Sequence, residues 1–222
     1  MIPDTDSAAC LSVVMPVFNE ENSVEAIVKK VLARPEVGEL LVIDDASTDA
    51  TRSRLAPFDN EPKVKLIFLH RNRGKGAALI RGFTEASMPF VVVQDADLEY
   101  DPGDYPKLLA PLVADEADVV YGSRLLGNPD LHFANRFANV VLTKFFNLFS
   151  GLRVTDMETC YKMFRRDVVR NLRLTSPRFG IEVEIGAKLA KIPRLRLREV
   201  PISYFPRLRG EGKKISGLDG AA

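Results

Sequence analysis

The sequence predicts an α/β protein built around a doubly wound, mostly parallel β-sheet. Continuous apolar runs rich in β-branched residues recur through the first half of the chain, as in strands that are covered on both faces. Segments with helical periodicity separate these runs, which is the order that right-handed crossovers require. Polar residues follow several runs directly, at the sheet edge where such folds bind ligands.

The elements of the first half follow from these patterns. Five apolar runs are predicted to be buried strands, at residues 11–17, 39–44, 64–69, 90–94 and 118–122. A helix is predicted over residues 21–32 because its apolar residues recur at helical spacing. These residues form one face: Val24, Ile27, Val28 and Val31.

The second half of the chain is less regular. Residues 133–149 and 181–190 are predicted to be helices, and residues 196–204 alternate like a strand. The segment after Arg207 is rich in Gly and Lys and has no apolar periodicity, which predicts a mobile loop. No repeat or linker interrupts the 222 residues, so one domain over residues 1–222 is expected.

The composition argues against several classes of protein. A net charge of +1 gives no global field that would favour nucleic acid as a partner. The two cysteines, Cys10 and Cys160, do not form a disulfide framework, and a reducing cytoplasm fits them better. The sequence has neither a secretion signal nor a stretch of about 18 apolar residues, so no membrane-spanning helix is expected. Contact with a membrane surface stays open.

An acidic segment, Asp95-Ala-Asp97-Leu-Glu99, directly follows one of the predicted strands. Alternate carboxylates at a strand end can converge on one hard cation, and oxygen ligands suit Mg²⁺ or Mn²⁺. Such a cation would neutralise the charge of a departing nucleoside diphosphate. The alternative interpretation is a solvated acidic turn in which one aspartate caps a helix.

A second acidic strand end is formed by Asp44 and Asp45. A carboxylate in this place can accept hydrogen bonds from a base or a ribose. Ser47 or Thr48 is expected to cap the helix that follows, with Asp49 in its first turn.

Residues 72–78, with the sequence Asn-Arg-Gly-Lys-Gly-Ala-Ala, resemble a phosphate loop without the spacing of a Walker A motif. Their glycines alone would fit a tight turn into a helix. Lys75 and the two flanking arginines favour an anionic ligand nearby. Further cations follow the acidic strand ends and are candidates for binding phosphate: Arg124, Arg136, Arg207 and the pair Lys213-Lys214.

Taken in order, the segments PVFNE, DDASTDAT, NRGKGAA and DADLEYDP resemble those of family 2 glycosyltransferases with a GT-A fold. The resemblance is closest to the dolichyl- and polyprenyl-phosphate sugar synthases, and it extends from about Leu11 to Lys214. It implies a nucleotide-sugar-binding half at about residues 11–125, an acceptor-side half at about 126–214, and a tail at 215–222.

The resemblance also implies roles for individual residues. Donor-binding positions are matched by Pro16, Asn19, Glu20, Asp44 and Asp45. The metal ligands are matched by Asp95, Asp97 and Glu99. Phosphate-binding positions are matched by Arg124, Arg136, Arg207 and Lys213, of which the last two belong to a loop that folds over the donor. Asp156 matches an acidic position near the acceptor, where a turn or helix cap is the alternative interpretation. Asp97, Arg124 and Asp156 are therefore the expected catalytic residues.

The implied reaction is inverting transfer of a sugar from a donor of the GDP-mannose, UDP-glucose or UDP-GlcNAc type to a polyprenyl or dolichyl phosphate. A phosphate acceptor needs no general base, whereas a sugar hydroxyl would need one, with Asp156 as the candidate. Transfer to a soluble or cell-surface glycan is the alternative. A non-catalytic nucleotide-sugar sensor is a different class, which the intact Asp95 and Asp97 disfavour. A sugar nucleotidyltransferase would need a glycine-rich loop with a lysine after the first strand.

The phenylalanine-rich helix at residues 133–149 bears on the acceptor. Its apolar face would pack into the core in most proteins. The width of that face and the single Lys144 also suit a membrane interface, where a lipid acceptor lies. Peripheral contact with the cytoplasmic face of a membrane is therefore a second expectation. Phe146 is taken as an outer phenylalanine, whose replacement would distinguish packing into the core from contact with a membrane.

Overall fold

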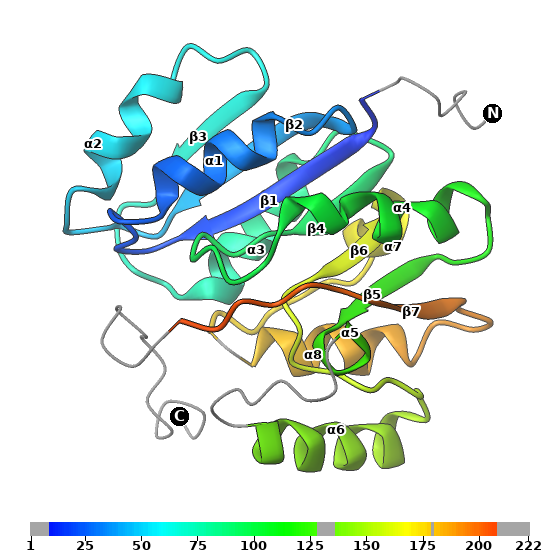
Figure 1. Ribbon diagram of the computed structural model, residues 1–222. Coiled ribbons are helices and arrows are strands. Elements are labelled where there is room, and N and C mark those ends of the chain that lie inside the picture. The colour runs from blue at the N-terminus through cyan, green and yellow to red at the C-terminus, as the bar shows by residue number, and fades with distance from the viewer. Residues whose placement is uncertain (1–8, 128–135, 179, 208–222) are drawn as a thin grey trace.

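The computed structural model describes residues 9–127, 136–178 and 180–207, and a single seven-stranded sheet runs through it (Figure 1). The strands are Leu11–Val17 (β1), Val37–Asp44 (β2), Val64–Phe68 (β3), Phe90–Val93 (β4), Val119–Ser123 (β5), Lys162–Arg165 (β6) and Leu197–Pro201 (β7). Their order across the sheet is β3-β2-β1-β4-β6-β5-β7. Only β6 runs against its neighbours; every other pairing is parallel. The predicted doubly wound, mostly parallel sheet is confirmed.

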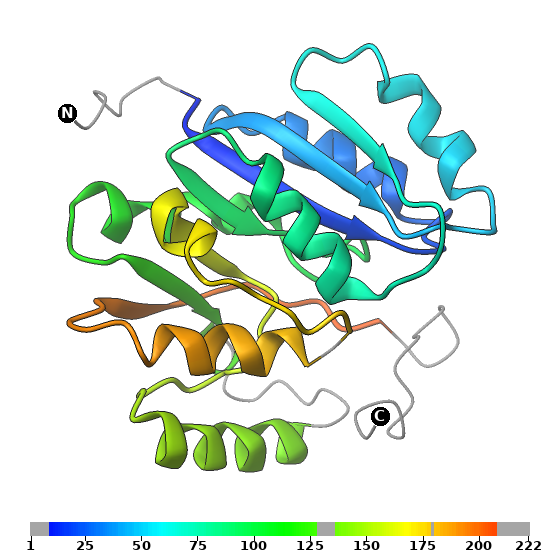
Figure 2. The ribbon, with the colours of Figure 1, turned by 180° about the vertical axis from the view of Figure 1, so that it is seen from behind.

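The helices cover both faces of this sheet. They are Val24–Leu32 (α1), Thr51–Leu55 (α2), Lys75–Glu85 (α3), Tyr105–Val113 (α4), Arg124–Gly127 (α5), Arg136–Ser150 (α6), Arg166–Arg170 (α7) and Ile181–Leu189 (α8). In Figure 1 α1 and α4 lie in front of the sheet, and the view from behind in Figure 2 brings α3, α7 and α8 to the front. The four apolar residues predicted to form the inner face of α1 are all fully buried.

All five strands predicted in the first half are present, with ends that differ by at most two residues from the apolar runs. The predicted strand at 196–204 is shorter in the structure, because its pairing with β5 ends at Pro201; Tyr204 forms a separate, isolated bridge to Tyr100. The sequence analysis missed β6. Its four residues include Lys162 and Arg165, and two charged residues in so short a segment hide the strand pattern.

The carboxyl ends of β1 and β4 form the centre of the site edge. These two strands are neighbours, and the strand order reverses between them, which creates a topological switch point. Three non-glycine residues with positive φ follow strands at this edge: Asn19 (52°), Ala46 (61°) and Leu98 (65°). Such conformations are costly for alanine and leucine and tend to occur at functional sites.

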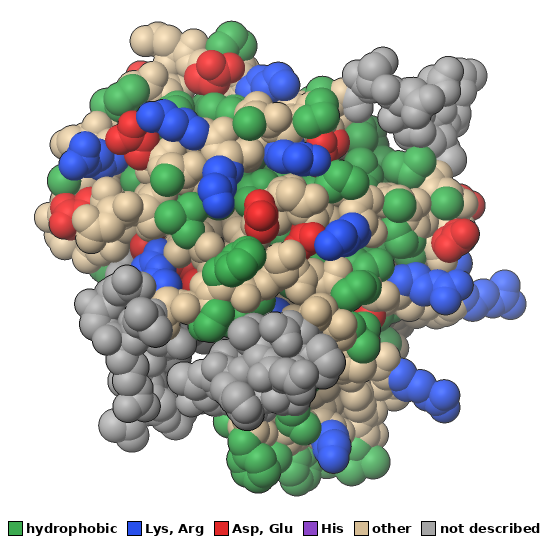
Figure 3. Space-filling view, in the orientation of Figure 1, with side chains coloured by type: hydrophobic (Ala, Val, Ile, Leu, Met, Phe, Trp, Pro, Cys, Tyr) green, Lys and Arg blue, Asp and Glu red, His purple; other side chains and the backbone are tan. Residues whose placement is uncertain are grey.

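Helix α6 is attached to the body through its polar residues. Asn139 donates to Asp156 at 2.8 Å, Thr143 accepts from a backbone N–H at 3.2 Å, and Asn147 bonds to the backbone of Val154. The opposite face of the helix is apolar and exposed, and Figure 3 shows hydrophobic side chains gathered over it. We call this the outer face of α6, and it consists of Phe137 (83% exposed), Leu142 (51%), Phe145 (59%), Leu148 (75%) and Phe149 (84%).

This orientation corrects two expectations about the phenylalanine-rich helix. The apolar face as a whole does not pack into the core. Phe146 is not an outer residue: it is partly buried against the core, and its ring lies so close to Gly186 of α8 that a Cβ there would be 2.4 Å from it. No helix in the described part of the chain combines the length and the apolar character needed to cross a bilayer.

Candidate active site

Arg207 joins three segments at the carboxyl edge of the sheet. Its Nη2 lies 2.8 Å from Oε2 of Glu20, which follows β1. Its Nε donates to the backbone oxygen of Asp97, which follows β4, at 2.8 Å. The structure therefore brings together residues that are up to 187 positions apart in the sequence. Asn19 lies in the same loop as Glu20, and its Oδ1 accepts the backbone N–H of Thr48 at 2.7 Å.

The two aspartates after β4 lie in a crowded acidic environment. Burial, followed by the charges of Asp95 and Glu99, raises the pKa of Asp97 to about 7. A carboxyl group that is hard to ionise because other carboxylates lie nearby is stabilised in its ionised form when a cation binds beside it. The oxygen donors of Asp95 and Asp97 match the preference of Mg²⁺ and Mn²⁺.

Glu99 is not grouped with these aspartates as the third ligand of the expected metal site. Its Oε2 accepts the hydroxyl of Tyr204 at 2.6 Å, and its Oε1 accepts the backbone N–H of Arg207 at 2.9 Å. Within the described residues, no group of three His, Cys, Asp or Glu side chains is placed to hold a metal. Two carboxylates remain, and Mg²⁺ is commonly bound by one or two carboxylates together with the phosphates of a substrate. The donor set therefore fits a cation that arrives with a nucleotide.

Lys75, the first residue of α3, lies beside the acidic pair. Its Nζ is 2.9 Å from Oδ1 of Asp95 and 3.2 Å from Oε1 of Glu182 on α8. Burial alone would lower the pKa of the Lys75 ammonium, but the charges of Asp95 and Glu182 hold it well above its usual value. The cation predicted to bind an anionic ligand is thus paired with carboxylates of the protein itself.

Asp45 occupies the backbone donors of the loop that resembles a phosphate loop. Its carboxylate accepts the N–H groups of Arg73 at 2.8 Å and Gly74 at 2.6 Å. The next glycine packs against another loop: a Cβ on Gly76 would lie 2.1 Å from the oxygen of Ser176. In the structure this segment is therefore a tight connection into α3, as its glycines alone would suggest, and Asp45 shapes it.

Asp44 is fully buried and has partners of its own. It lies 2.6 Å from Nε of Arg52 and accepts the backbone N–H of Ser47. The prediction that Ser47 or Thr48 caps α2 is wrong, because the helix begins at Thr51 after Ala50 and has no side-chain cap at that residue. Ser47 instead accepts the backbone N–H of Asn19 at 2.9 Å, which ties the loop after β2 to the loop after β1.

Asp156 and Arg124, which directly follows β5, form a buried ion pair. The guanidinium holds the carboxylate through two bonds of 2.7 and 2.8 Å, and Asn139 adds a third. Burial by itself would raise the pKa of Asp156, but the bonds and the charge of Arg124 hold it below its usual range. The Arg124 guanidinium also lies 5.1 Å from the centre of the Tyr204 ring. This geometry fits neither a general base nor an arginine open to phosphate, the roles expected of the two residues. The cap interpretation is borne out in part, because Asp156 also accepts the backbone N–H of Arg124, the first residue of α5, at 3.1 Å.

Glu158 is a candidate that the sequence analysis did not single out. It is half-buried, and in the part of the chain that the structure describes its carboxylate has no hydrogen bond and no ion pair. Burial raises its pKa above the usual value. The signal in the sequence was its place two residues after Asp156 in the same acidic segment.

The remaining predicted residues are only partly placed. Pro16 lies near the end of β1, opposite Ile43 of β2, and is partly exposed. Arg136 is the first residue of α6, and its side chain lies outside the described residues. Lys213 and the loop predicted after Arg207 also lie outside them.

The sequence and the fold have counterparts among known proteins. The chain matches the sequence profile of Glycosyl transferase family 2 over residues 12–173. The chain belongs to this family. It is similar to the low-salt glycan biosynthesis hexosyltransferase Agl6 of Haloferax volcanii, at 34% identity over 98% of this chain and 52% of the relative. It is also similar to the dodecaprenyl-phosphate galacturonate synthase of Rhizobium johnstonii, at 28% identity over 91% of this chain and 61% of that relative. The chain thus spans between half and two thirds of these relatives.

A solved structure has a similar fold. Glucosyl-3-phosphoglycerate synthase from Mycobacterium tuberculosis, in complex with Mn²⁺, UDP and glucosyl-3-phosphoglycerate, superposes with a TM-score of 0.68. The match covers 92% of this chain and 75% of that one, at 23% identity. The predictions of family 2 membership and of a GT-A fold are therefore confirmed.

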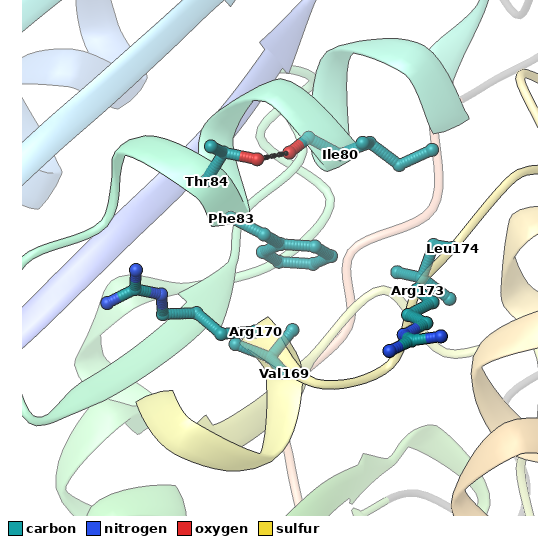
Figure 4. A pocket seen from close by; sticks show the side chains of 7 residues that line it. All are labelled: Ile80, Phe83, Thr84, Val169, Arg170, Arg173 and Leu174. Carbon is teal, nitrogen blue, oxygen red and sulfur yellow. Dashed lines mark hydrogen bonds between the residues drawn. The ribbon is translucent and has the colours of Figure 1, made fainter.

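A cavity of about 280 Å³ lies elsewhere on this family 2 domain, between α3 and α7 (Figure 4). Four apolar side chains, one threonine and two arginines line it: Ile80, Phe83, Thr84, Val169, Arg170, Arg173 and Leu174. None of these residues takes part in the contacts at the carboxyl edge. The candidate active site is therefore the edge itself, where the acidic residues and Arg207 meet.

Proposed function

We propose that this chain transfers a sugar from a nucleoside-diphosphate sugar to a polyprenyl phosphate with inversion at the anomeric carbon. The observation that carries the proposal is the crowded acidic pair at the switch point, since Asp95 and Asp97 form an oxygen site that fits Mg²⁺ or Mn²⁺ with a nucleotide. The named relative that acts on dodecaprenyl phosphate supports the lipid acceptor.

The proposed mechanism relies mainly on charge stabilisation. When bound, the divalent cation would neutralise the charge that develops on the departing diphosphate. Asp95 and Asp97 would hold that cation. Arg207, which already joins Glu20 to the backbone of Asp97, would fix the loops that enclose the donor. A polyprenyl phosphate brings an anionic oxygen as nucleophile, so no residue of this chain has to remove a proton from it.

A transfer assay tests this proposal. The protein is incubated with Mn²⁺, a short polyprenyl phosphate and each of a panel of UDP- and GDP-sugars, and the products are analysed for glycolipid by mass spectrometry. The expected result is a sugar-phosphate lipid from one class of donor, lost in EDTA. Donor turnover that is the same with and without the lipid, and yields no glycolipid, would refute the lipid acceptor.

The outer face of α6 is proposed to lie on the cytoplasmic surface of the membrane. Five large apolar side chains on one exposed helix face are what an interfacial helix buries in the headgroup region. Such contact would bring a water-soluble donor site to an acceptor whose tail lies in the bilayer.

We expect Phe145→Ser to change thermal stability by less than about 0.5 kcal/mol but to weaken binding to anionic liposomes about tenfold, because the lost contact is with lipid. Phe146→Ser is the matched control, one residue away on the same helix. Because Phe146 packs against α8, its replacement is expected to cost about 2 kcal/mol of stability and to leave liposome binding of the folded protein unchanged. Co-sedimentation with liposomes measures the binding of each variant, and a thermal melt measures its stability. Wild-type protein that does not sediment with liposomes would contradict the membrane contact.

A hydroxyl acceptor on a glycan is the second candidate, and Glu158 is the observation that favours it. Its carboxylate is half-buried, has a raised pKa and makes no hydrogen bond or ion pair among the described residues, so it suits a general base better than Asp156 does. If the acceptor is a hydroxyl, Glu158→Gln is expected to slow transfer about 100-fold. If the acceptor is a phosphate, the same variant is expected to keep most of its rate. Steady-state rates with both acceptor types distinguish the two functions.

A further inference from the structure

A chain of alternating charges, partly exposed at Asp95 and Lys75 and buried at Glu182 and Lys162, links the acidic pair to α8. Asp95 contacts Lys75, Lys75 contacts Glu182, and Glu182 contacts Lys162. Glu182 lies in the first turn of α8, is 5% exposed and touches both lysines through different oxygens. The two ammonium groups balance the two carboxylates, so this chain is neutral when no other ion is present.

Lys75 lies where it can pair with either carboxylate. Its Nζ is 2.9 Å from Asp95 and 3.2 Å from Glu182, so both contacts are within ion-pair distance at once. The backbone around it is fixed, because the N–H of Ala77 donates at 2.9 Å to the oxygen of Pro177, in the loop that precedes α8. A shift of the flexible lysine side chain toward Glu182 would free the oxygens of Asp95 without moving the helix.

The other end of the chain keeps Glu182 in place. The Lys162 side chain on β6 is 1% exposed, donates to both Glu182 and the backbone oxygen of Thr159, and lies 5.0 Å from the ring centre of Tyr121. A buried carboxylate held by one lysine is a fixed acceptor for a second one.

We infer that Glu182 is a positioning residue for metal binding: it receives the Lys75 ammonium and thereby releases Asp95 to the divalent cation. The inference rests on the proposed function, which supplies the cation and its site at Asp95 and Asp97. In the absence of the cation Lys75 is the counter-ion of Asp95. Without Glu182, Asp95 would be the one carboxylate of the described residues left within ion-pair distance of Lys75, and the ammonium would compete with the incoming cation for it.

The test measures Mn²⁺ affinity by the electron paramagnetic resonance signal of free Mn²⁺, with UDP or GDP present, and it does not use turnover. Glu182→Gln is expected to weaken Mn²⁺ binding about tenfold. In a Lys75→Met background the same substitution is expected to have no effect, because the competing ammonium is gone. Glu85→Gln, at the far end of α3, removes an equal charge from a partly exposed site away from the acidic pair and is expected to leave the affinity unchanged.

The outcomes separate this inference from the proposed function. An equal loss from Glu182→Gln in both backgrounds would mean that Glu182 acts through its field alone, and would overturn the inference. An unchanged Mn²⁺ affinity in the Glu182→Gln single variant would also overturn the inference. Wild-type protein that binds no Mn²⁺ with either nucleotide would overturn the metal site itself and the inference with it. If Glu182→Gln does not fold, the comparison is made in a Lys162→Met background, where the buried ammonium that needs Glu182 is absent.

Discussion

Asp95→Asn and Asp97→Asn are each expected to reduce sugar transfer by at least about 100-fold, which corresponds to roughly 3 kcal/mol of transition-state stabilisation. The reason is that each substitution removes one of the two carboxylates left to hold a cation after Glu99 is engaged by Tyr204 and Arg207. The thermal midpoint of Asp97→Asn is expected to stay the same or rise, since the change relieves a crowded, partly desolvated carboxylate.

The comparison uses initial rates at saturating donor beside thermal melts of the same preparations. Glu99→Gln is measured as a comparison variant, because the Glu99 carboxylate holds Tyr204 and the backbone of Arg207. We expect it to weaken the attachment of Tyr204 and Arg207 and to lower stability more than Asp97→Asn does. Near-normal turnover in both aspartate variants, or full activity in EDTA, would contradict the metal site.

Asp156→Ala is expected to destabilise the protein by about 3–5 kcal/mol, because it leaves the buried guanidinium of Arg124 without its carboxylate. Glu116→Ala, at an exposed carboxylate, is the control and should stay within about 0.5 kcal/mol of the wild type. Denaturant unfolding at pH 7 measures both.

The same pair predicts an acid dependence. Because Arg124 holds the pKa of Asp156 below its usual range, the contribution of the pair to stability is present above about pH 4 and is lost as the pH falls through the lower pKa of the folded state.

Asp156→Asn should lose stability while its folded fraction keeps most of its activity. A loss of more than about 100-fold in activity with an unchanged melt would instead show that Asp156 is the base.

The sequence predicted the sheet well because its strands are continuous apolar runs that end in polar residues. That pattern alone indicates that the site edge lies after β1, β2 and β4. It could not locate β6, because the buried ammonium of Lys162 is stabilised there by Glu182, which is 20 residues away in the sequence.

Two further features depend on tertiary structure in the same way. Hydrophobic periodicity showed that α6 has an apolar face but gave no direction for it, and only the bonds made by Asn139, Thr143 and Asn147 show that its polar face points inward. The carboxylates of Asp44 and Asp45 were assigned to the ligand from their position at a strand end. In the structure Asp44 pairs with Arg52 on α2, and Asp45 accepts the backbone N–H groups of Arg73 and Gly74 in the loop before α3. No local sequence pattern specifies these contacts.

The most direct test of the central claim is the metal dependence of nucleotide binding. Titration calorimetry of UDP and of GDP into the wild-type protein and Asp97→Asn, each with Mn²⁺ and with EDTA, separates the nucleotide from the cation. The account predicts that one nucleotide binds the wild type in Mn²⁺, and that binding weakens at least tenfold both in EDTA and in Asp97→Asn. Equal affinity in all of these conditions would contradict it.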